Sequence, residues 1–178
     1  MSTPNIIALS GSLRSGSFTS AVLRSAVAQA PSGLHITIVD TVRHLPLYDE
    51  DLADVGAGDA MRAEIRAADG VLIATPEYNH HLPSPLKNWL DWASRPYGKH
   101  SLVEKPVAVF GVSPGPTGAK LAVDYLRNVL PALGAKLIGD ELALGSITDH
   151  LDVETGTVSD QVSASLAALL LAFQHSFD

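Results

Sequence analysis

The sequence predicts an α/β protein built on a five-stranded, doubly wound parallel sheet. Short apolar runs alternate with helical patterns along the whole chain, the order that a parallel sheet covered on both faces requires. Three of these runs end in loops rich in glycine, proline and serine. The chain has 178 residues, with no repeat and no long linker, so we expect a single domain over residues 1–178.

Five apolar stretches are the expected strands. Each is short and rich in Ile, Val or Leu, as strands buried on both faces of a parallel sheet are. The first, NIIALS, leads into a small-residue loop, and the third is stopped by a proline. The expected strands occupy residues 5–10, 34–40, 69–76, 105–113 and 134–145, the last as one strand or as a bent strand pair.

Apolar residues at helical spacing predict a helix after each strand. Pro31 and Gly33 end the first, and Asp59 is the expected N-cap of the second. Prolines stand at the start of the third helix, where a missing N–H costs little. The expected helices occupy residues 18–30, 59–68, 83–96, 118–132 and 159–177, and residues 46–52 form an irregular connection.

Composition excludes several classes of function. A net charge of −7 argues against a nucleic-acid or anionic-membrane partner. The absence of cysteine excludes disulfides, thiolate metal sites and thiol chemistry. The N-terminal stretch lacks the basic region of a signal peptide, and the apolar run near the C-terminus is far shorter than the ~20 residues that span a bilayer. We therefore expect a soluble cytoplasmic protein.

Ligands of doubly wound sheets bind beyond the carboxyl ends of the strands, where loops 10–19, 76–83 and 113–118 lie. The first loop, SGSLRSGSFTS, opens a helix, and its hydroxyls together with Arg14 suit a phosphate. It lacks the Gly-Lys-Ser/Thr of triphosphate loops and the Gly-x-Gly-x-x-Gly of dinucleotide loops, so a terminal monophosphate fits best. A serine-rich turn with capping residues is the alternative.

The second loop, TPEYNHHLPSP, offers fixed backbone groups and Tyr78 to a flat heterocycle. Adjacent histidines point to opposite sides, and no third ligand stands at a helpful spacing, so we expect no metal at His80 and His81. Glu77 is either a general base or a structural carboxylate. Trp89 and Trp92 fit a core or an interface better than a ligand cage.

The third loop, GVSPGPTGAK, contains two glycines that allow close approach of backbone to a ligand. These are Gly115 and Gly118. A purely structural turn explains the same glycines equally well.

Three segments carry a resemblance to a known family. GSLRSGSFTS (11–20) resembles the GSLRxxSxN phosphate loop of the NAD(P)H-dependent FMN reductases, and PEYNHHLPSPLKNWLDWASR (76–95) resembles their PEYNxSxPGxLKNxxDWxSR signature. PLYDEDL (46–52) looks like their PLYDxDL segment. The resemblance implies a flavodoxin-like three-layer α/β/α fold with strand order 2-1-3-4-5.

The same resemblance implies the cofactor site. Ser12, Arg14, Ser17 and Thr19 would surround the FMN phosphate, and residues of the second loop would line the isoalloxazine ring. The full implied set is Ser12, Leu13, Arg14, Ser17, Phe18, Thr19, Pro76, Glu77, Tyr78, Asn79 and Ser113. The family also implies a homodimer or homotetramer. Thr19 replaces the usual Asn, so we expect an amide contact to the phosphate to be lost or replaced by a hydroxyl. His81 replaces a Ser and Ser84-Pro85 a Gly, so we expect a bulkier, stiffer second loop.

The expected activity is ping-pong transfer of hydride from NAD(P)H to FMN and then to a quinone, free flavin, azo compound or similar small acceptor. The flavin carries this chemistry, so no side chain is expected to be catalytic. The sequence leaves NADH and NADPH open. The alternative is a flavodoxin-type electron carrier without NAD(P)H activity, and a third hypothesis is a flavin-free interaction or sensor protein on the same fold.

Overall fold

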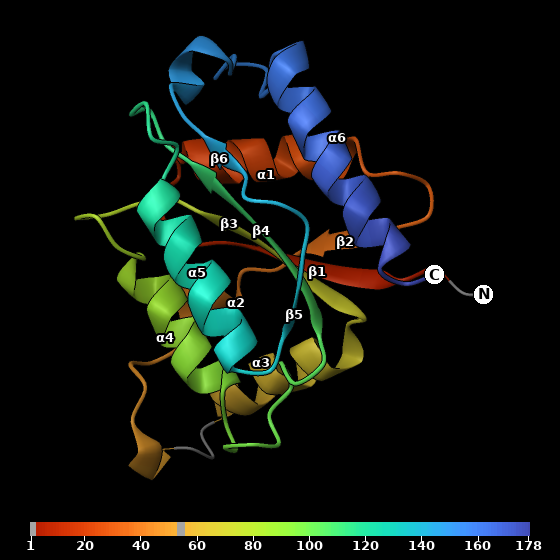
Figure 1. The fold of residues 1–178 in the computed structure, drawn as a ribbon. Helices are drawn as coiled ribbons and strands as arrows, with labels where there is room; N and C mark the ends of the chain where they lie inside the picture. Colours follow the sequence, from red (N-terminus) through yellow and green to blue (C-terminus); the bar gives the residue numbers. More distant parts are fainter. Residues whose placement is uncertain (1–2, 53–55) are drawn as a thin grey trace.

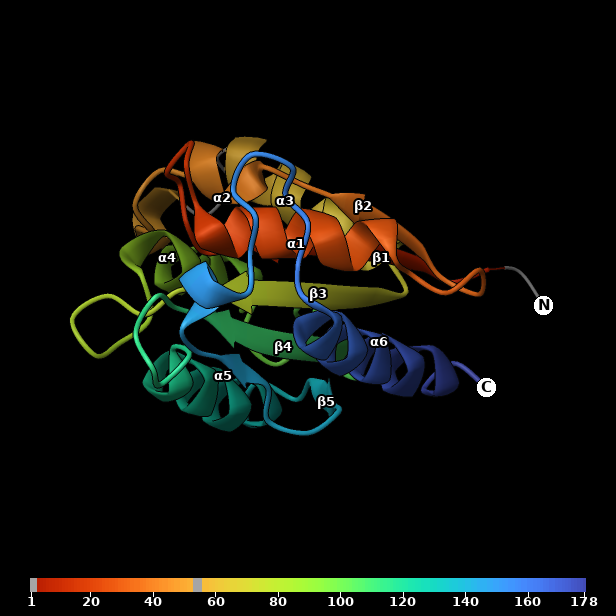
Figure 2. The same cartoon turned by 90° about the horizontal axis from the view of Figure 1, so that it is seen from above.

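The computed structural model describes residues 3–52 and 56–178, and it shows a parallel sheet between two layers of helices (Figures 1 and 2). The strand order β2-β1-β3-β4-β5 is the predicted one, and every pair of neighbours is parallel. The strands are β1 (Asn5–Ser10), β2 (His35–Ile38), β3 (Gly70–Thr75), β4 (Pro106–Val112), β5 (Lys136–Ile138) and β6 (Ala143–Leu144).

The helices alternate with the strands as predicted, apart from a short additional helix after β2. They are α1 (Phe18–Ala28), α2 (Thr41–His44), α3 (Gly56–Ala67), α4 (Ser84–Ala93), α5 (Lys120–Ala132) and α6 (Asp160–His175). Two short 3-10 helices lie at Glu50–Leu52 and Ile147–Asp149. The first of them ends the connection at 46–52 that the sequence left irregular.

The sheet separates two hydrophobic cores. Alternate residues of β1 point to opposite faces, with Ile7 and Leu9 in one core and Ile6 and Ala8 in the other. The first core is covered by α2, α3, α4 and α5, and the second by α1 and α6, which lie in front of the sheet in Figure 2. The central strand β3 is buried along its whole length, as the continuous apolar run predicts.

The last strand position is the bent pair rather than one continuous strand. Both β5 and β6 pair with β4, the first beside Pro106 and the second beside Gly111. Gly139 follows β5 with a φ of +78°, which turns the backbone out of the extended conformation.

One expectation about helices needs correction. Asp59 is not an N-cap, because α3 already begins at Gly56 and Asp59 instead pairs with Arg62 in the first turns. The expectation that Trp89 and Trp92 belong to a core or an interface is confirmed, because both are fully buried in the first core. Burial within the chain explains both aromatics without a partner.

Candidate functional site

Three loops form the walls of one cleft at the carboxyl edge of the sheet. The loops follow β1, β3 and β4, and because these strands are parallel neighbours the loops lie at the same edge, at the left in Figure 2. The cleft has a volume of about 190 Å³. It is lined by Ser12, Arg14, Ser17, Phe18, Thr19, Pro76, Glu77, Tyr78, Val112, Ser113 and Pro114.

The first wall is the amino end of α1. Ser17 is the N-cap, and its hydroxyl oxygen accepts a hydrogen bond from the N–H of Ser20 at 3.1 Å. Among the described residues, the backbone N–H groups of residues 14–19 have no hydrogen-bond acceptor. The side chain of Thr19 is nearly buried, and the guanidinium of Arg14 is exposed and has no partner in the described chain. The first wall of the cleft therefore combines the start of a helix, hydroxyl groups and one cation.

The second wall is a tight hairpin. The backbone of Tyr78 exchanges two hydrogen bonds of 3.1 Å with His81, and the two residues between them, Asn79 and His80, have φ values of 51° and 61°. Positive φ at both central positions defines a type I′ turn. Asn79 therefore stands at the tip of the hairpin, where Asn tolerates the left-handed backbone.

This hairpin is fastened to its surroundings on two sides. The Oε2 atom of Glu77 accepts a hydrogen bond from the N–H of Leu121 in the first turn of α5 at 3.0 Å. The ring of His81 packs on the ring of Tyr125 with centroids 4.6 Å apart. Across the cleft, the hydroxyl of Tyr78 lies 3.2 Å from the hydroxyl of Ser12. The structure thus makes Glu77 a structural carboxylate.

The third wall is held by β6. Ser113 lines the cleft, and its hydroxyl accepts a hydrogen bond from the N–H of Gly115 at 3.0 Å. A Cβ on Gly118, which has a φ of +65°, would lie 2.4 Å from the carbonyl carbon of Ala143. The close backbone approach at Gly118 is therefore to the neighbouring strand and not to a ligand.

The cleft brings together all of the cofactor residues expected from the sequence except Leu13 and Asn79. Leu13 packs toward the first core, and Asn79 occupies the hairpin tip. The sequence missed Val112 and Pro114, which flank Ser113. Their position at the carboxyl end of the fourth strand was the signal that could have placed them at the cleft.

The described residues contain neither a cluster of metal ligands nor a membrane-spanning helix. No group of three or more His, Cys, Asp or Glu side chains in that part of the chain could hold a metal ion. No helix within it is long and apolar enough to cross a membrane.

Comparison with known proteins decides the family. The model of the NADPH-dependent FMN reductase family matches residues 4–149. The chain belongs to this family. It is 37% identical over 173 residues to the NAD(P)H-dependent FMN reductase of Pseudomonas aeruginosa, covering 95% of this chain and 92% of that protein. It is also 37% identical over 161 residues to the quinone reductase of Escherichia coli, covering 88% and 85% of the two chains.

A solved structure gives the same assignment. The flavoenzyme NAD(P)H:(acceptor) oxidoreductase FerB of Paracoccus denitrificans superposes with a TM-score of 0.85 at 30% identity, covering 97% of this chain and 98% of that one. The flavodoxin-like fold and the family expected from the motifs are confirmed. As a member of the FMN reductase family, the protein is an enzyme of the oxidoreductase class.

Two segments that carry the FMN reductase resemblance contact each other. The amide of Asn88 donates to the carbonyl of Pro46 at 2.8 Å and accepts from the N–H of Tyr48 at 2.7 Å. The indole N–H of Trp92 donates to the same Pro46 carbonyl at 2.9 Å. The PLYD and LKNxxDW segments are thus joined by three hydrogen bonds.

Two of the three departures from the FMN reductase pattern lie outside the cleft. Ser84 and Pro85 form the first turn of α4 after the N-cap Pro83, so their stiffness belongs to the helix rather than to the loop. His81 rests on Tyr125. Only Thr19 lines the cleft itself.

Proposed function

We propose that the protein is an FMN-dependent NAD(P)H oxidoreductase that reduces a quinone or a similar small acceptor. One observation carries the proposal: unpaired N–H groups at the start of α1 and the Tyr78 hairpin face each other across a single cleft. The names of the relatives, FMN reductase and quinone reductase, support the same activity. The acceptor and the ping-pong order are part of the proposal.

The residues of the first wall fit the phosphate of FMN. A phosphate monoester needs several hydrogen-bond donors and positive potential, and the free N–H groups of residues 14–19 at a helix amino end supply both. Ser12, Ser17 and Thr19 add hydroxyl donors, and Arg14 adds a charge-assisted one. We assign the phosphate to these residues.

The second wall fits the flavin ring. The N–H of Tyr78 already donates to His81, and Pro76 has none, so Glu77 and Asn79 offer the unused N–H groups of this segment. These donors would stabilise negative charge on the reduced ring. The cleft of about 190 Å³ lies below the ~300–1,000 Å³ typical of whole-ligand sites, so the ring would extend past its open mouth.

Bound FMN would supply the redox chemistry, which is hydride transfer from NAD(P)H and two-electron, two-proton reduction of the acceptor, with the second proton from water. The task of the chain is to fix the ring by the Glu77 and Asn79 N–H groups, so that donor and acceptor can occupy its open face in turn. The mouth of the cleft is open to water, so protons need no dedicated side chain.

A spectroscopic experiment tests the proposal. Purified protein, reconstituted with FMN, is mixed anaerobically with NADH or NADPH, and a quinone is added afterwards. The proposal predicts rapid loss of the flavin absorbance and its rapid return with quinone. A flavin that bleaches only with a separate reductase would instead indicate a carrier, and a chain that never binds FMN would refute both.

We also propose, from the family resemblance, a homodimer or homotetramer. The buried tryptophans provide no support for a contact, but exposed apolar side chains remain on several elements, including Leu121 on α5 and Leu171 on α6. Light scattering coupled to gel filtration tests this proposal, and a monomeric mass at micromolar concentration would refute it.

A further inference from the structure

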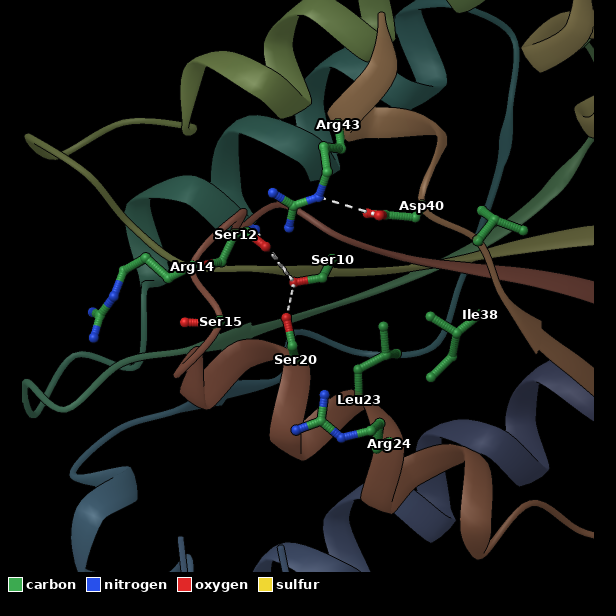
Figure 3. Close-up of a pocket in the computed structure, with 11 residues that line it drawn as sticks. Ser10, Ser12, Arg14, Ser15, Ser20, Leu23, Arg24, Ile38, Asp40 and Arg43 are labelled. Atoms are coloured by element: carbon green, nitrogen blue, oxygen red, sulfur yellow. Dashed lines mark hydrogen bonds and ion pairs between the residues drawn. The ribbon is translucent and has the colours of Figure 1, made fainter.

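A second cavity, of about 440 Å³, is lined in part by the same phosphate loop as the cleft, and Figure 3 shows its lining residues. It opens between α1 and the end of β2, on the face of the sheet that α1 covers. Arg24 of α1 and Arg43 of α2 stand on opposite sides of it, as Figure 3 shows, and the serine hydroxyls of residues 10 and 20 lie between them. Neither arginine was among the residues expected from the sequence.

The charge of this cavity is opposite to that of the protein. The chain carries a net charge of −7, yet the cavity is lined by Arg14, Arg24 and Arg43 with one carboxylate, that of Asp40. The Nε of Arg43 lies 3.1 Å from Asp40 Oδ2, so the only anion is already paired. Arg24 has no partner among the described residues, and the two hydrogen bonds of Arg43 use its Nε and Nη2, so its Nη1 remains available. Because Arg14 is assigned to the FMN phosphate, Arg24 and Arg43 are the cations that would meet a dianion such as a phosphate monoester.

The cavity also has an apolar wall, which inorganic phosphate would not need. Leu23 forms its base, and Ile38, at the end of β2, is 42% exposed although it lies on the core-facing side of the strand. Apolar surface beside guanidinium planes suits a flat heterocycle. The combined features fit a phosphorylated nucleoside better than a simple anion.

The two cavities are neighbours. Ser12 and Arg14 line both of them. The cleft lies at the end of β3 and the second cavity at the end of β2, which are two strand spacings apart, or about 10 Å. An extended dinucleotide is longer than this span, so a molecule with its nicotinamide at the cleft can reach the second cavity with its adenosine end.

We propose that the second cavity binds the 2′-phosphoadenosine end of NADPH, with Arg24 and Arg43 as the phosphate-binding residues. This assignment rests on the proposed function and adds to it a preference for NADPH over NADH. The hydrogen bond of 2.9 Å from Arg43 Nη2 to the carbonyl of Leu13 also connects this cavity to the phosphate loop.

Ligand binding without turnover is the first test. Adenosine 2′,5′-bisphosphate and 5′-AMP are titrated into the FMN-loaded protein by calorimetry. We expect the bisphosphate to bind at least about tenfold more tightly, and Arg24→Gln to abolish that preference. The matched control is Arg66→Gln: Arg66 is exposed on α3, on the other face of the sheet, and its loss should leave the preference intact. Equal binding of both nucleotides would overturn the proposal.

Kinetics provides the second test. In Arg24→Gln the ratio of KM for NADPH to KM for NADH should rise about tenfold, whereas in Arg66→Gln it should not change. An unchanged ratio in both variants, with rapid oxidation of both dinucleotides, would overturn the second site and leave the proposed function standing. Failure to oxidise either dinucleotide would refute the proposed function, and the calorimetry would still report on the cavity. If inorganic phosphate displaced the bisphosphate at equal concentration, the cavity would be a simple anion site and the proposal would be wrong.

Discussion

Replacing Glu77 by alanine is predicted to remove the cap of α5 and to release the hairpin that carries Tyr78. The N-cap position of α5, Ala119, has a φ of 65° and no side-chain acceptor, so the carboxylate of Glu77 satisfies the helix from outside at 3.0 Å from the Leu121 nitrogen. A hydrogen bond to a charged group contributes roughly 1.5–3 kcal/mol, and an anion at a helix amino end contributes about 0.3–1 kcal/mol. Both figures describe the same contact between Glu77 and α5, so they are not added. The side chain is only 13% exposed, so we expect a loss of about 2 kcal/mol in the free energy of unfolding.

Urea unfolding of the apoprotein measures this loss. Glu77→Gln keeps an acceptor oxygen without the charge and should lose only about 0.5–1 kcal/mol. The matched control is Glu141→Gln, which breaks the exposed ion pair between Glu141 and Lys120 beside the same helix end and should change the free energy of unfolding very little, because solvent screens that pair. The Kd for FMN should also rise in Glu77→Ala, because the hairpin loses its anchor. A Glu77→Ala protein as stable as the Glu141 control would refute this role.

Three further predictions concern His80, Asn88 and His100. His80→Gly should stabilise the protein by about 1 kcal/mol in urea unfolding, because Asn-Gly is the preferred pair for a type I′ turn. The variant also loses the 3.5 Å contact with Glu77, but the His80 side chain is highly exposed, so this contact contributes little. A loss of stability would argue against the turn. Asn88→Ala and Asn88→Asp should each lower the free energy of unfolding by about 2–3 kcal/mol. Alanine removes both hydrogen bonds to the 46–48 segment, and aspartate turns the bond to the Pro46 carbonyl into a repulsion between two oxygens. An aspartate variant nearly as stable as the unmodified protein would contradict this geometry. Burial and the charge of Arg95 lower the pKa of His100, so the unfolded chain binds the proton more readily than the folded chain. The free energy of unfolding should therefore fall as the pH drops below about 6.5 and on through the folded pKa. His100→Gln should flatten this fall in urea unfolding at different pH values, and an equal slope in the variant would exclude His100 as its source.

The sheet and its cleft could be predicted because their signals are local. Apolar runs specify buried parallel strands, and parallel strands must bring their following loops to one edge. The serine-rich loop after β1 does contain a capping residue, because Ser17 is the N-cap of α1. The doubly wound sheet and the place of the cleft therefore followed from pattern and topology together, whereas the strand order followed from the family resemblance.

The features that could not be predicted depend on contacts between distant segments. Asp59 resembled an N-cap because the preceding glycines hid an earlier helix start. Asn79 fitted the ring-binding segment, but the positive φ that places it at the hairpin tip is not visible in sequence. Arg24 and Arg43 are separated by 19 residues and look like ordinary surface charges until β1 and β2 pair and bring them to one cavity.

The most direct test of the assigned flavin site compares two ligands that differ only in the phosphate. FMN and riboflavin are titrated into the apoprotein by flavin fluorescence. At least two charge-assisted hydrogen bonds from the α1 end, each worth roughly 1.5 kcal/mol or more, correspond to a Kd for FMN about a hundredfold lower than for riboflavin. Arg14→Ala should reduce that ratio. A ratio close to one in the unmodified protein would contradict the assignment of the cleft between residues 12–19 and 76–79 as the FMN site.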